Sequence, residues 1–581
     1  MTWGAEPVTI VEIDQDYCQE SYGVAPCAAV LGTTGDDKCF NTYRSCQSSE
    51  IWNRGTLTLR FAEPVMELPR EWHVIPSVSS VSIEPTRLNV GGAYQGSGPL
   101  GQRGKCTVTF QDHPDGDIKV DPYLADRAYD PFTRSTFWAK WLARNVYYKN
   151  RIMRIYQGYL GQEIADMKVS HFVIDKLTGP DSSGRVKITG LDILRFADND
   201  KAQAPALSTG ELFADITDTD TSCTISGALA TDYPASGTVR IGDEVITYTS
   251  RAQNGALVDF SGLTRGTDGS TAEGHETGDR VQACLRYTTE MAHDVTRELL
   301  IDYAGVPSAF IPYADWDAEA QVWLPQFRVT TLISEPTGVQ DLIAEITGEC
   351  QFYIWWHETT QEIRLRAVRP ATEDPVTWNE AGHILADSMS ATEDTNQRVS
   401  RVWVYYQPRN WAEDLDDEAN FRKVRLSIDA DSESPSEYDE SKVKRIYCRW
   451  ISTDAQALNL GSRYLARYRD NQKYLTVRVD AVNRDTWTAD VVDITASPYV
   501  DFTGNTETRR FQVISAKEVQ AGEVIQYDLQ EFGFIGGKFA FWMEHDAKTY
   551  ENSTEVERRS GAWWSDENGL LPDGSDGYTW Q

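Results

Sequence analysis

Four cysteines near the start of the chain constrain its first segment more than any other feature of the sequence. Cys18, Cys27, Cys39 and Cys46 follow the spacing C-x8-C-x11-C-x6-C within 29 residues. The residues between them are rich in Gly, Asp, Thr and Ser and offer little material for a hydrophobic core. A region of this kind needs a covalent or metal staple to hold one fold. We therefore expect a loop-rich, cysteine-organised lobe at residues 1–52.

Four thiolates match three kinds of site: tetrahedral zinc, a [4Fe–4S] cluster, or two disulfides. Structural zinc sites commonly use close C-x2–4-C pairs, which this segment lacks, and the wide gaps are easier to reconcile with a cluster. Residues 1–20 show no basic start or apolar run of an export signal, so we expect synthesis in a reducing cytoplasm. Disulfides therefore rank third. Spacing alone leaves all three open.

Length, composition and charge limit the functions to consider. At 581 residues the chain should divide into roughly three to five domains. Hydrophobic residues (40%) and aromatic residues (11%) indicate a folded protein. The net charge of −33 would repel nucleic acid, so we expect no specific nucleic-acid binding, although an acidic conduit would let DNA slide. No apolar stretch of about 18 residues predicts a transmembrane segment.

The remaining chemistry-bearing residues do not form a motif typical of catalysis. The eight histidines are widely separated, and H-E-x-x-H, G-x-S-x-G and phosphate-loop motifs are absent. His113 beside Asp112 and Asp115 is interpreted as part of a turn stabilised by Asp side chains. The other cysteines are expected to be small buried residues: Cys106, Cys223, Cys284, Cys350 and Cys448. We predict that the chain is not an enzyme.

Hydrophobic periodicity predicts a mainly β protein with some α-helix. Apolar and polar residues alternate in the predicted strands, at residues 57–61, 105–110, 153–160, 186–191, 241–248, 351–357, 363–367, 475–479, 511–514 and 524–529. Helices are predicted at residues 137–148, 287–303, 339–350 and 455–468. The acidic run at residues 411–442 indicates a solvated loop.

Short stretches around the four cysteines are recognisable: Asp16-Tyr17-Cys18, Tyr22-Gly23, Pro26-Cys27, Gly32-x-Thr34-Gly35, and Lys38-Cys39-Phe40-Asn41-Thr42 through Cys46-Gln47. They resemble the cysteine-rich segment of tail tip hub proteins of long-tailed, siphovirus-like bacteriophages and gene transfer agents. In that family the cysteines are associated with an iron–sulfur cluster. The resemblance therefore implies that Cys18, Cys27, Cys39 and Cys46 bind a [4Fe–4S] cluster, with zinc as the alternative.

Longer stretches are similar to other parts of the same hub proteins. The first barrel region is resembled by residues 107–117, 121–123, 135–140 and 143–144. A small β module of phage tail proteins is resembled by residues 241–244, 263–267, 275 and 278–282. The second barrel region is resembled by residues 460–465. The resemblance implies a multidomain fold with two hub-type β-barrels, helical connections, an inserted small β module and a cysteine-rich metal lobe. The expected parts are the lobe (1–52), first barrel region (53–201), inserted module (202–284), mixed α/β region (285–390), second barrel region (391–540) and docking tail (541–581).

The family also implies a function and partners. A homotrimer would form a ring of pseudo-sixfold symmetry in the tail tip of the virion, join the tail tube to tip parts, and let DNA pass. Its implied partners are the distal tail protein, the tape measure protein, and central fibre or receptor-binding proteins. The alternatives are an iron–sulfur redox enzyme, for which no dinucleotide motif is present, or a hub with cell-wall hydrolase activity. Without catalytic partners, the cluster is interpreted as a structural staple.

Overall fold

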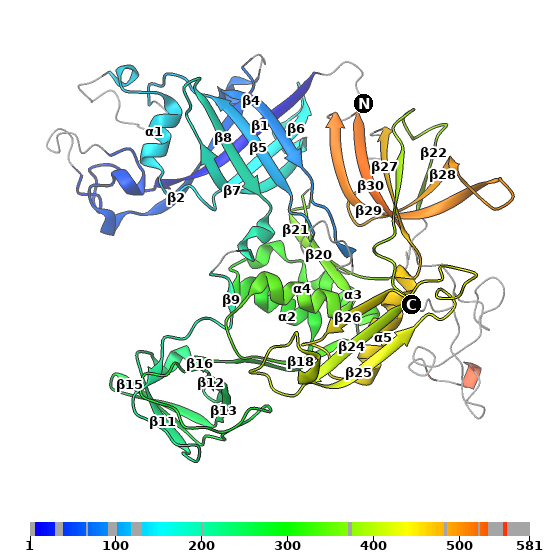
Figure 1. Cartoon of the computed structure of the whole chain (residues 1–581). Coiled ribbons are helices and arrows are strands. Elements are labelled where there is room, and N and C mark those ends of the chain that lie inside the picture. Colours follow the sequence, from blue (N-terminus) through cyan, green and yellow to red (C-terminus); the bar gives the residue numbers. More distant parts are fainter. Residues whose placement is uncertain are drawn as a thin grey trace.

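The protein is mainly β, with several sheets and a small number of helices between them (Figure 1). The computed structural model describes residues 6–29, 39–64, 68–90, 101–117, 130–198, 201–358, 360–369, 375–480, 485–520, 523–532, 550–552 and 554. No helix in this part of the chain is long and apolar enough to cross a membrane. The expected docking tail, residues 541–581, lies outside the described residues except for a turn at Tyr550–Asn552 and for Thr554.

The first large sheet has eight strands in the order β3-β2-β1-β6-β7-β8-β5-β4. Their bounds are Val74–Pro76, Arg54–Ala62, Pro7–Cys18, Ile152–Tyr159, Lys168–Thr178, Arg185–Leu191, Lys105–Gln111 and Val78–Glu84. Helix α1, Phe137–Arg144, buries Trp138 against one face of this sheet, where it contacts Phe61 and Phe110. The expectation of a loop-rich start is wrong for Pro7–Cys18, which is an inner strand of this sheet.

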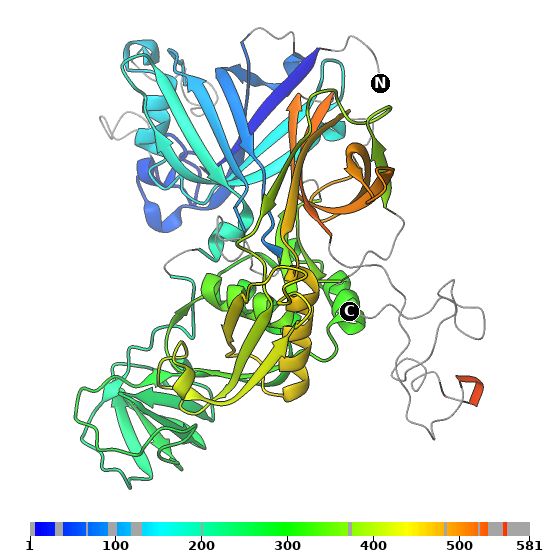
Figure 2. The same ribbon diagram turned by 45° about the vertical axis from the view of Figure 1, so that its right-hand side comes forward.

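The second large sheet has six strands in the order β22-β28-β29-β30-β27-β23. Their bounds are Val376–Asn379, Val491–Val500, Thr506–Gln520, Val524–Glu531, Gln472–Asp480 and Ser390–Asp394. Its apolar face forms a core around Trp378, Phe511 and Tyr527. Both views place the two large sheets at one end of the molecule (Figures 1 and 2).

The two large sheets end in the same way. One edge strand is parallel to its neighbour, β3 to β2 and β22 to β28, while the other edge strand is antiparallel, β4 to β5 and β23 to β27. The two edges are consecutive in the chain: Ser77 alone separates β3 from β4, and residues 380–389 separate β22 from β23. Among the described strands neither ladder returns to its first strand, so these sheets are open where the resemblance implied closed barrels.

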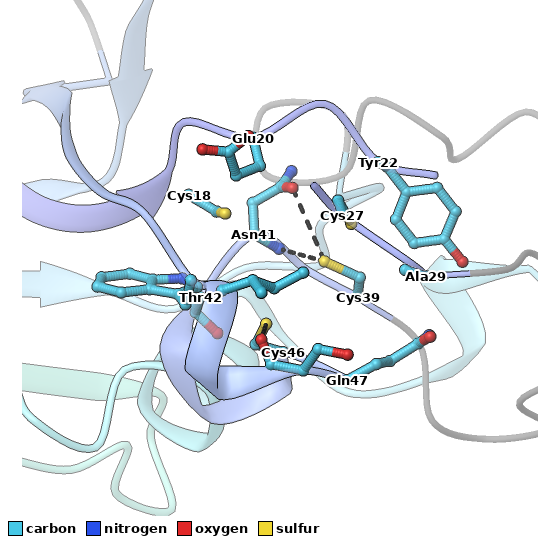
Figure 3. A pocket seen from close by; sticks show the side chains of 13 residues that line it. Cys18, Glu20, Tyr22, Cys27, Ala29, Cys39, Asn41, Thr42, Cys46 and Gln47 are labelled. Atoms are coloured by element: carbon cyan, nitrogen blue, oxygen red, sulfur yellow. Dashed lines mark hydrogen bonds between the residues drawn. The ribbon is translucent and has the colours of Figure 1, made fainter. Parts of the chain in front are cut away.

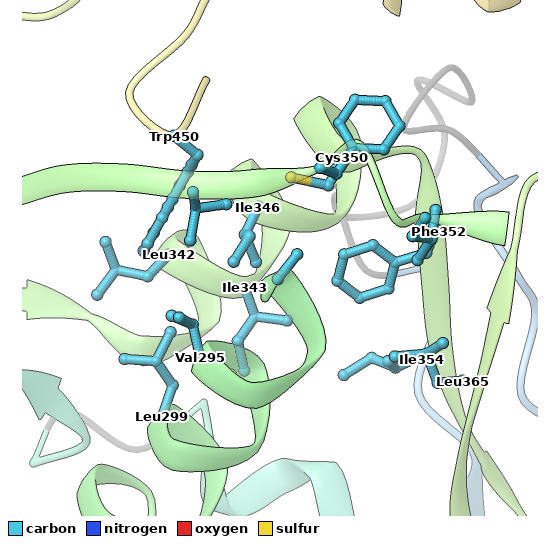
Figure 4. Close-up of a cluster of buried hydrophobic side chains, with 14 of the residues drawn as sticks. Val295, Leu299, Leu342, Ile343, Ile346, Cys350, Phe352, Ile354, Leu365 and Trp450 are labelled. Atoms are coloured by element: carbon cyan, nitrogen blue, oxygen red, sulfur yellow. The ribbon is translucent and has the colours of Figure 1, made fainter. Parts of the chain in front are cut away.

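A mixed α/β region lies between the large sheets and the inserted module. It contains β17 (Leu285–Met291), α2 (Ala292–Glu298), α3 (Tyr313–Trp323), β18 (Arg328–Ile333), α4 (Val339–Cys350), β20 (Phe352–His357) and β21 (Glu362–Ala367). Leu342, Ile343 and Ile346 of α4 face Val295 and Leu299 in the largest buried core (Figure 4). The helix predicted at residues 287–303 is wrong in its first part, because β17 pairs with β18.

The inserted module packs two small sheets around its own core. One sheet contains β10 (Glu211–Leu212), β11 (Ser222–Ser226), β15 (Leu257–Ser261) and β14 (Ser250–Asn254); the other contains β13 (Glu244–Tyr248), β12 (Gly237–Ile241) and β16 (Gln282–Ala283). The single strand predicted at residues 241–248 is wrong, because Gly242 at φ +57° turns the chain into a hairpin. Entry and exit lie together, since Ala283 N donates to Ser208 Oγ at 3.0 Å.

A third sheet pairs β24 (Arg401–Pro408) with β25 (Phe421–Ile428) and β26 (Val443–Tyr447), and α5 (Asp454–Tyr468) packs against it. The acidic run predicted as a loop at residues 411–442 therefore contains β25. A two-residue ladder joins β9 (Gln203–Ala204) to β19 (Thr337–Gly338). The helices predicted at residues 339–350 and 455–468 are confirmed.

Candidate metal centre

The four cysteines of the opening segment line one pocket (Figure 3). Cys18 is the last residue of β1, Cys27 lies in the turn that follows, and Cys39 and Cys46 flank the short helix η1, Tyr43–Ser45. The pocket contains about 420 Å³ of space that atoms do not fill, part of it open to solvent. The four thiols thus converge from the end of a strand and from the loops beside it.

Backbone and side-chain hydrogen bonds hold the cysteine loops against β1. Cys18 N donates to Asn41 O at 2.8 Å, which ties the end of the strand to the loop that carries Cys39. Asn41, at φ +58°, turns back so that its own N–H donates to Cys39 Sγ at 3.3 Å. Ser45 Oγ accepts from Phe40 N at 3.0 Å and closes η1 onto the same loop. The positions of these thiols are therefore set by the local chain.

The electrostatics of the pocket oppose thiolate formation without a cation. Burial raises the pKa of the Cys39 thiol, and the nearby Cys46, Cys18 and Cys27 raise it further, although the Asn41 N–H lowers it. Burial likewise raises the pKa of Cys46. A bound metal would reverse this preference because metal ligation requires thiolates. All nine cysteines of the chain are free of disulfides.

The separation of the thiols bears on the kind of group they could hold. Among the described residues, no group of three or more His, Cys, Asp or Glu side chains is arranged as a metal site. Four thiolates on one zinc would lie about 3.8 Å apart, given a Zn–S distance of about 2.3 Å. A [4Fe–4S] cluster spreads its thiolates more widely because each binds a different iron. That Cys18, Cys27, Cys39 and Cys46 bind metal stays a prediction.

A buried indole N–H in the same pocket has no acceptor. Trp52 lines the pocket, and its Nε1 is buried without a hydrogen-bond partner. An indole nitrogen can only donate, and leaving such a donor unsatisfied costs about 1–3 kcal/mol. A sulfur atom of a bound cluster would supply the missing acceptor. The sequence contained no signal for this residue, because its role depends on the loops folding back over β1.

The other candidate residues occupy structural positions. Asp112 caps α1: its Oδ1 accepts from Trp138 N at 2.9 Å, and its Oδ2 accepts from Thr136 Oγ1. Asp115 Oδ2 accepts from Asp117 N, so the turn predicted around His113 is confirmed. The prediction of buried cysteines is also confirmed at Cys106, Cys223, Cys284, Cys350 and Cys448.

A strongly perturbed carboxyl group also serves the fold. Burial raises the pKa of Glu349 to about 8, with a further rise from the neighbouring Glu345. Its two oxygens accept the backbone N–H groups of Arg449 and Trp450 at 2.9 and 2.8 Å. Glu349 therefore fastens α4 to the segment after β26.

The comparison with solved structures gives distant matches. The chain is similar to a tail protein from Neisseria meningitidis MC58, with 12% identity, a TM-score of 0.34, and 74% of this chain and 88% of that chain covered. It is also similar to prophage tail protein gp18 from Listeria monocytogenes EGD-e, with 10% identity and a TM-score of 0.29; the match covers 66% of this chain and 86% of that chain. A third similar structure is the 43 kDa tail protein of prophage MuSo2 from Shewanella oneidensis, with 8% identity and a TM-score of 0.34; the match covers 79% of this chain and 98% of that chain. All three are tail proteins. No family model matches the sequence, and no curated protein matches it.

Proposed function

We propose that this chain is a structural hub protein at the tip of a phage-type tail and that its four-cysteine pocket holds a [4Fe–4S] cluster. The observation that carries the cluster proposal is the pocket itself, which is lined by all four thiols of a segment resembling hub proteins. The wide sequence spacing supports a cluster over zinc. The acceptor-less Trp52 N–H would suit a sulfur acceptor in either kind of site.

In this proposal Cys18, Cys27, Cys39 and Cys46 are the ligands, and the cluster supplies positive charge that stabilises four thiolates. Its role is structural. Cys18 would tie the sheet to the turn at Cys27 and to the two ends of η1, in a region with few buried side chains. We assign no catalytic residue.

The hub proposal includes a homotrimeric ring whose barrel-like regions join the tail tube to the tip. The proposed partners are the distal tail protein, the tape measure protein and fibre or receptor-binding proteins, and the virion tail tip is the proposed location. Support comes from the sequence stretches that resemble both barrel regions and the inserted module. The net charge of −33 suits a conduit to which DNA does not adhere.

Anaerobic purification of the full chain tests the cofactor. We expect about four irons and four sulfides per chain and a broad visible absorbance, as a [4Fe–4S] centre requires. Zinc in place of iron, or no metal, would overturn the cluster.

Light scattering and reconstitution with tail components test the hub separately. We expect the mass of a trimer. A chain that stays monomeric at high concentration and also fails to join tail complexes would overturn the hub role, whatever its metal content.

A further inference from the structure

The sheet formed by β24, β25 and β26 has two different faces. Helix α5 packs against the face that carries Val402, Val404 and Tyr406, and all three side chains are buried (Figure 2). The register places residues 401, 403 and 405 of β24 beside residues 428, 426 and 424 of β25 and beside residues 443, 445 and 447 of β26. Because side chains alternate along a strand, these residues share the opposite face, which we call the outer face.

The outer face is apolar, although the exposed face of a sheet is ordinarily polar. Its most prominent apolar and aromatic members are Trp403, Tyr405, Val424, Ile428, Val443 and Tyr447. The three aliphatic side chains among them are 47–48% exposed, and the ring centroids of the two tyrosines lie 5.1 Å apart. Exposed apolar side chains that gather in one patch mark an interaction surface.

The same strands are basic in an acidic protein. They contain six Lys or Arg residues, one in β24, three in β25 and two in β26, and no Asp or Glu, although the chain has a net charge of −33. The exposed Arg422 and Arg445 form no ion pair with any residue that the structure describes. Both share the outer face, since Arg445 is opposite Trp403 and Arg422 is two residues before Val424. These two charges favour an acidic partner.

The carboxylates at the two ends of the outer face already have partners. Glu418 accepts from the Tyr405 hydroxyl at 3.0 Å at one end, and Glu433 pairs with Arg401 at the other. Arg445 lies between these ends. Nucleic acid would satisfy the free arginines but would offer little to cover the exposed aliphatic side chains. A protein segment that is both acidic and apolar fits the outer face better.

The end of this chain has that chemistry. Residues 560–581, which lie outside the described part of the chain, contain four acidic residues and no Lys or Arg. The apolar and aromatic residues of the same stretch are Trp563, Trp564, Leu570, Leu571, Tyr578 and Trp580. Residues 533–559 separate it from Phe532, and 27 residues of extended chain span about 90 Å. The radius of gyration expected for a compact protein of this length is about 25 Å, so the segment is long enough to reach the outer face.

We propose that residues 560–581 dock on the outer face of the β24–β26 sheet of the same molecule. The tryptophans cover the exposed aliphatic side chains, and the acidic residues pair with Arg422 and Arg445. Attachment to the chain gives the segment an effective concentration of about millimolar at this face. The proposal depends neither on the metal of the cysteine pocket nor on assembly into a hub.

Fluorescence anisotropy of a labelled peptide with the sequence of residues 560–581 tests the proposal on the full chain. In the natural protein the attached segment competes with the peptide. The full chain that carries Trp563→Ala and Trp564→Ala has a weaker competitor and should bind the peptide at least about tenfold more tightly. Adding Arg445→Glu or Val424→Asp to that chain should weaken peptide binding by about tenfold or more, because each places a negative charge against an acidic segment.

Two controls separate docking from a general loss of structure. Arg70→Glu changes an exposed arginine beside the first large sheet and should leave peptide binding unchanged. A peptide with Asp573→Lys and Asp576→Lys should bind the Arg445→Glu chain more tightly than the natural peptide does. A misfolded chain could not produce this rescue, and circular dichroism of each variant verifies its fold.

Each other result overturns the proposal. Equal binding of the peptide to the natural chain and to the tryptophan variant would show that the attached segment does not occupy the peptide's site. Binding that Arg445→Glu and Val424→Asp leave unchanged would exclude the outer face. Tighter binding of a single-stranded DNA oligonucleotide than of the peptide would make this a nucleic-acid surface. A lower oligomer mass of the tryptophan variant in light scattering would place the segment on another copy of the chain.

Discussion

The cysteine lobe and the inserted β module are both small regions rich in Gly, Thr and Asp, but they differ in what fills their interiors. Among described residues 19–29 and 39–53 of the lobe, Ala29, Asn41 and Thr42 alone are buried. The module instead has its own hydrophobic core, formed by Ile225, Val239, Ile246, Tyr248, Val258, Phe260 and others.

The module also contains a fully satisfied buried charge. Glu244, whose side chain is 0% exposed, accepts two hydrogen bonds from Arg265 at 2.9 and 2.6 Å and one from His275. The backbone N–H groups of Gly266 and Glu273 complete its shell. In the lobe, by contrast, four thiols and the Trp52 N–H surround unfilled space. A small region can be stabilised by its own core or by a bound group, and we infer that the lobe uses the second route.

Removing one thiol should have the largest effect. In the full chain purified without oxygen, Cys27→Ser should lose most of the iron and visible absorbance. Because the lobe has few buried side chains, hydrogen exchange at residues 19–53 should rise sharply. Cys223→Ala, in the core of the module, is the control and should keep its iron. Unchanged iron and exchange in Cys27→Ser would exclude Cys27 as a ligand.

Breaking the buried charge cluster should be the next largest effect. Arg265→Met leaves the Glu244 carboxylate buried without its main partner, and removal of one member of such a pair typically costs about 3–5 kcal/mol. Denaturant unfolding followed through hydrogen exchange at residues 209–281 measures this loss. Arg280→Met, at an exposed position of the same module, should change stability by less than about 0.5 kcal/mol. Equal effects of the two variants would mean that the cluster does not hold the module.

The pH dependence of the module should show a smaller effect. Burial opposes ionisation of Glu244, but hydrogen bonds from Arg265, His275 and two backbone N–H groups outweigh it and lower the pKa of Glu244. Its contribution is therefore complete above the unfolded pKa of about 4.3 and is lost as pH falls below that value. Melting temperatures between pH 6 and pH 3 should fall more steeply for the natural protein than for Glu244→Gln. Parallel curves would contradict this assignment.

The smallest predicted effect concerns the indole of the lobe. Trp52→Phe keeps an aromatic ring next to Tyr43 but removes the N–H. If that N–H donates to the cluster, its loss should shift the reduction potential to a more negative value while iron content stays the same, because hydrogen bonds to cluster sulfur raise the potential. Spectroelectrochemical titration of both proteins measures the shift. Equal potentials would show that the donor points elsewhere.

The local sequence pattern predicted those helices and strands whose formation does not depend on contacts with distant residues. Helix α5 has a helical apolar stripe and a capping box in which Thr453 and Gln456 satisfy each other's backbone N–H, so its prediction needed no tertiary information. Strand β1 was missed because Glu12 and Asp14 look like solvent-exposed positions. Both are buried, since Arg60 and Arg154 of the neighbouring strands β2 and β6 pair with them.

The residues of the candidate site also differ in whether the sequence alone could predict them. The thiols were predictable because four cysteines close together in sequence are a local pattern. Trp52 was not, because it becomes notable only when folding buries its N–H group without an acceptor. Such a group is a property of the three-dimensional surroundings, and neither residue type nor spacing reports it.

The joined entry and exit of the inserted module have a consequence for how chains of this kind change over generations. Ser208 N donates to the side chain of Gln282, whose Nε2 donates to Ala206 O, so the two connecting segments meet within hydrogen-bond distance. Recombination can delete or exchange the residues between the entry and the exit of the module. The remaining chain then has almost no gap to close, because its two ends already lie together. The joined entry and exit of the module are thus a site at which an inserted domain can be exchanged. A lineage can acquire a new surface there and keep the remaining architecture in place.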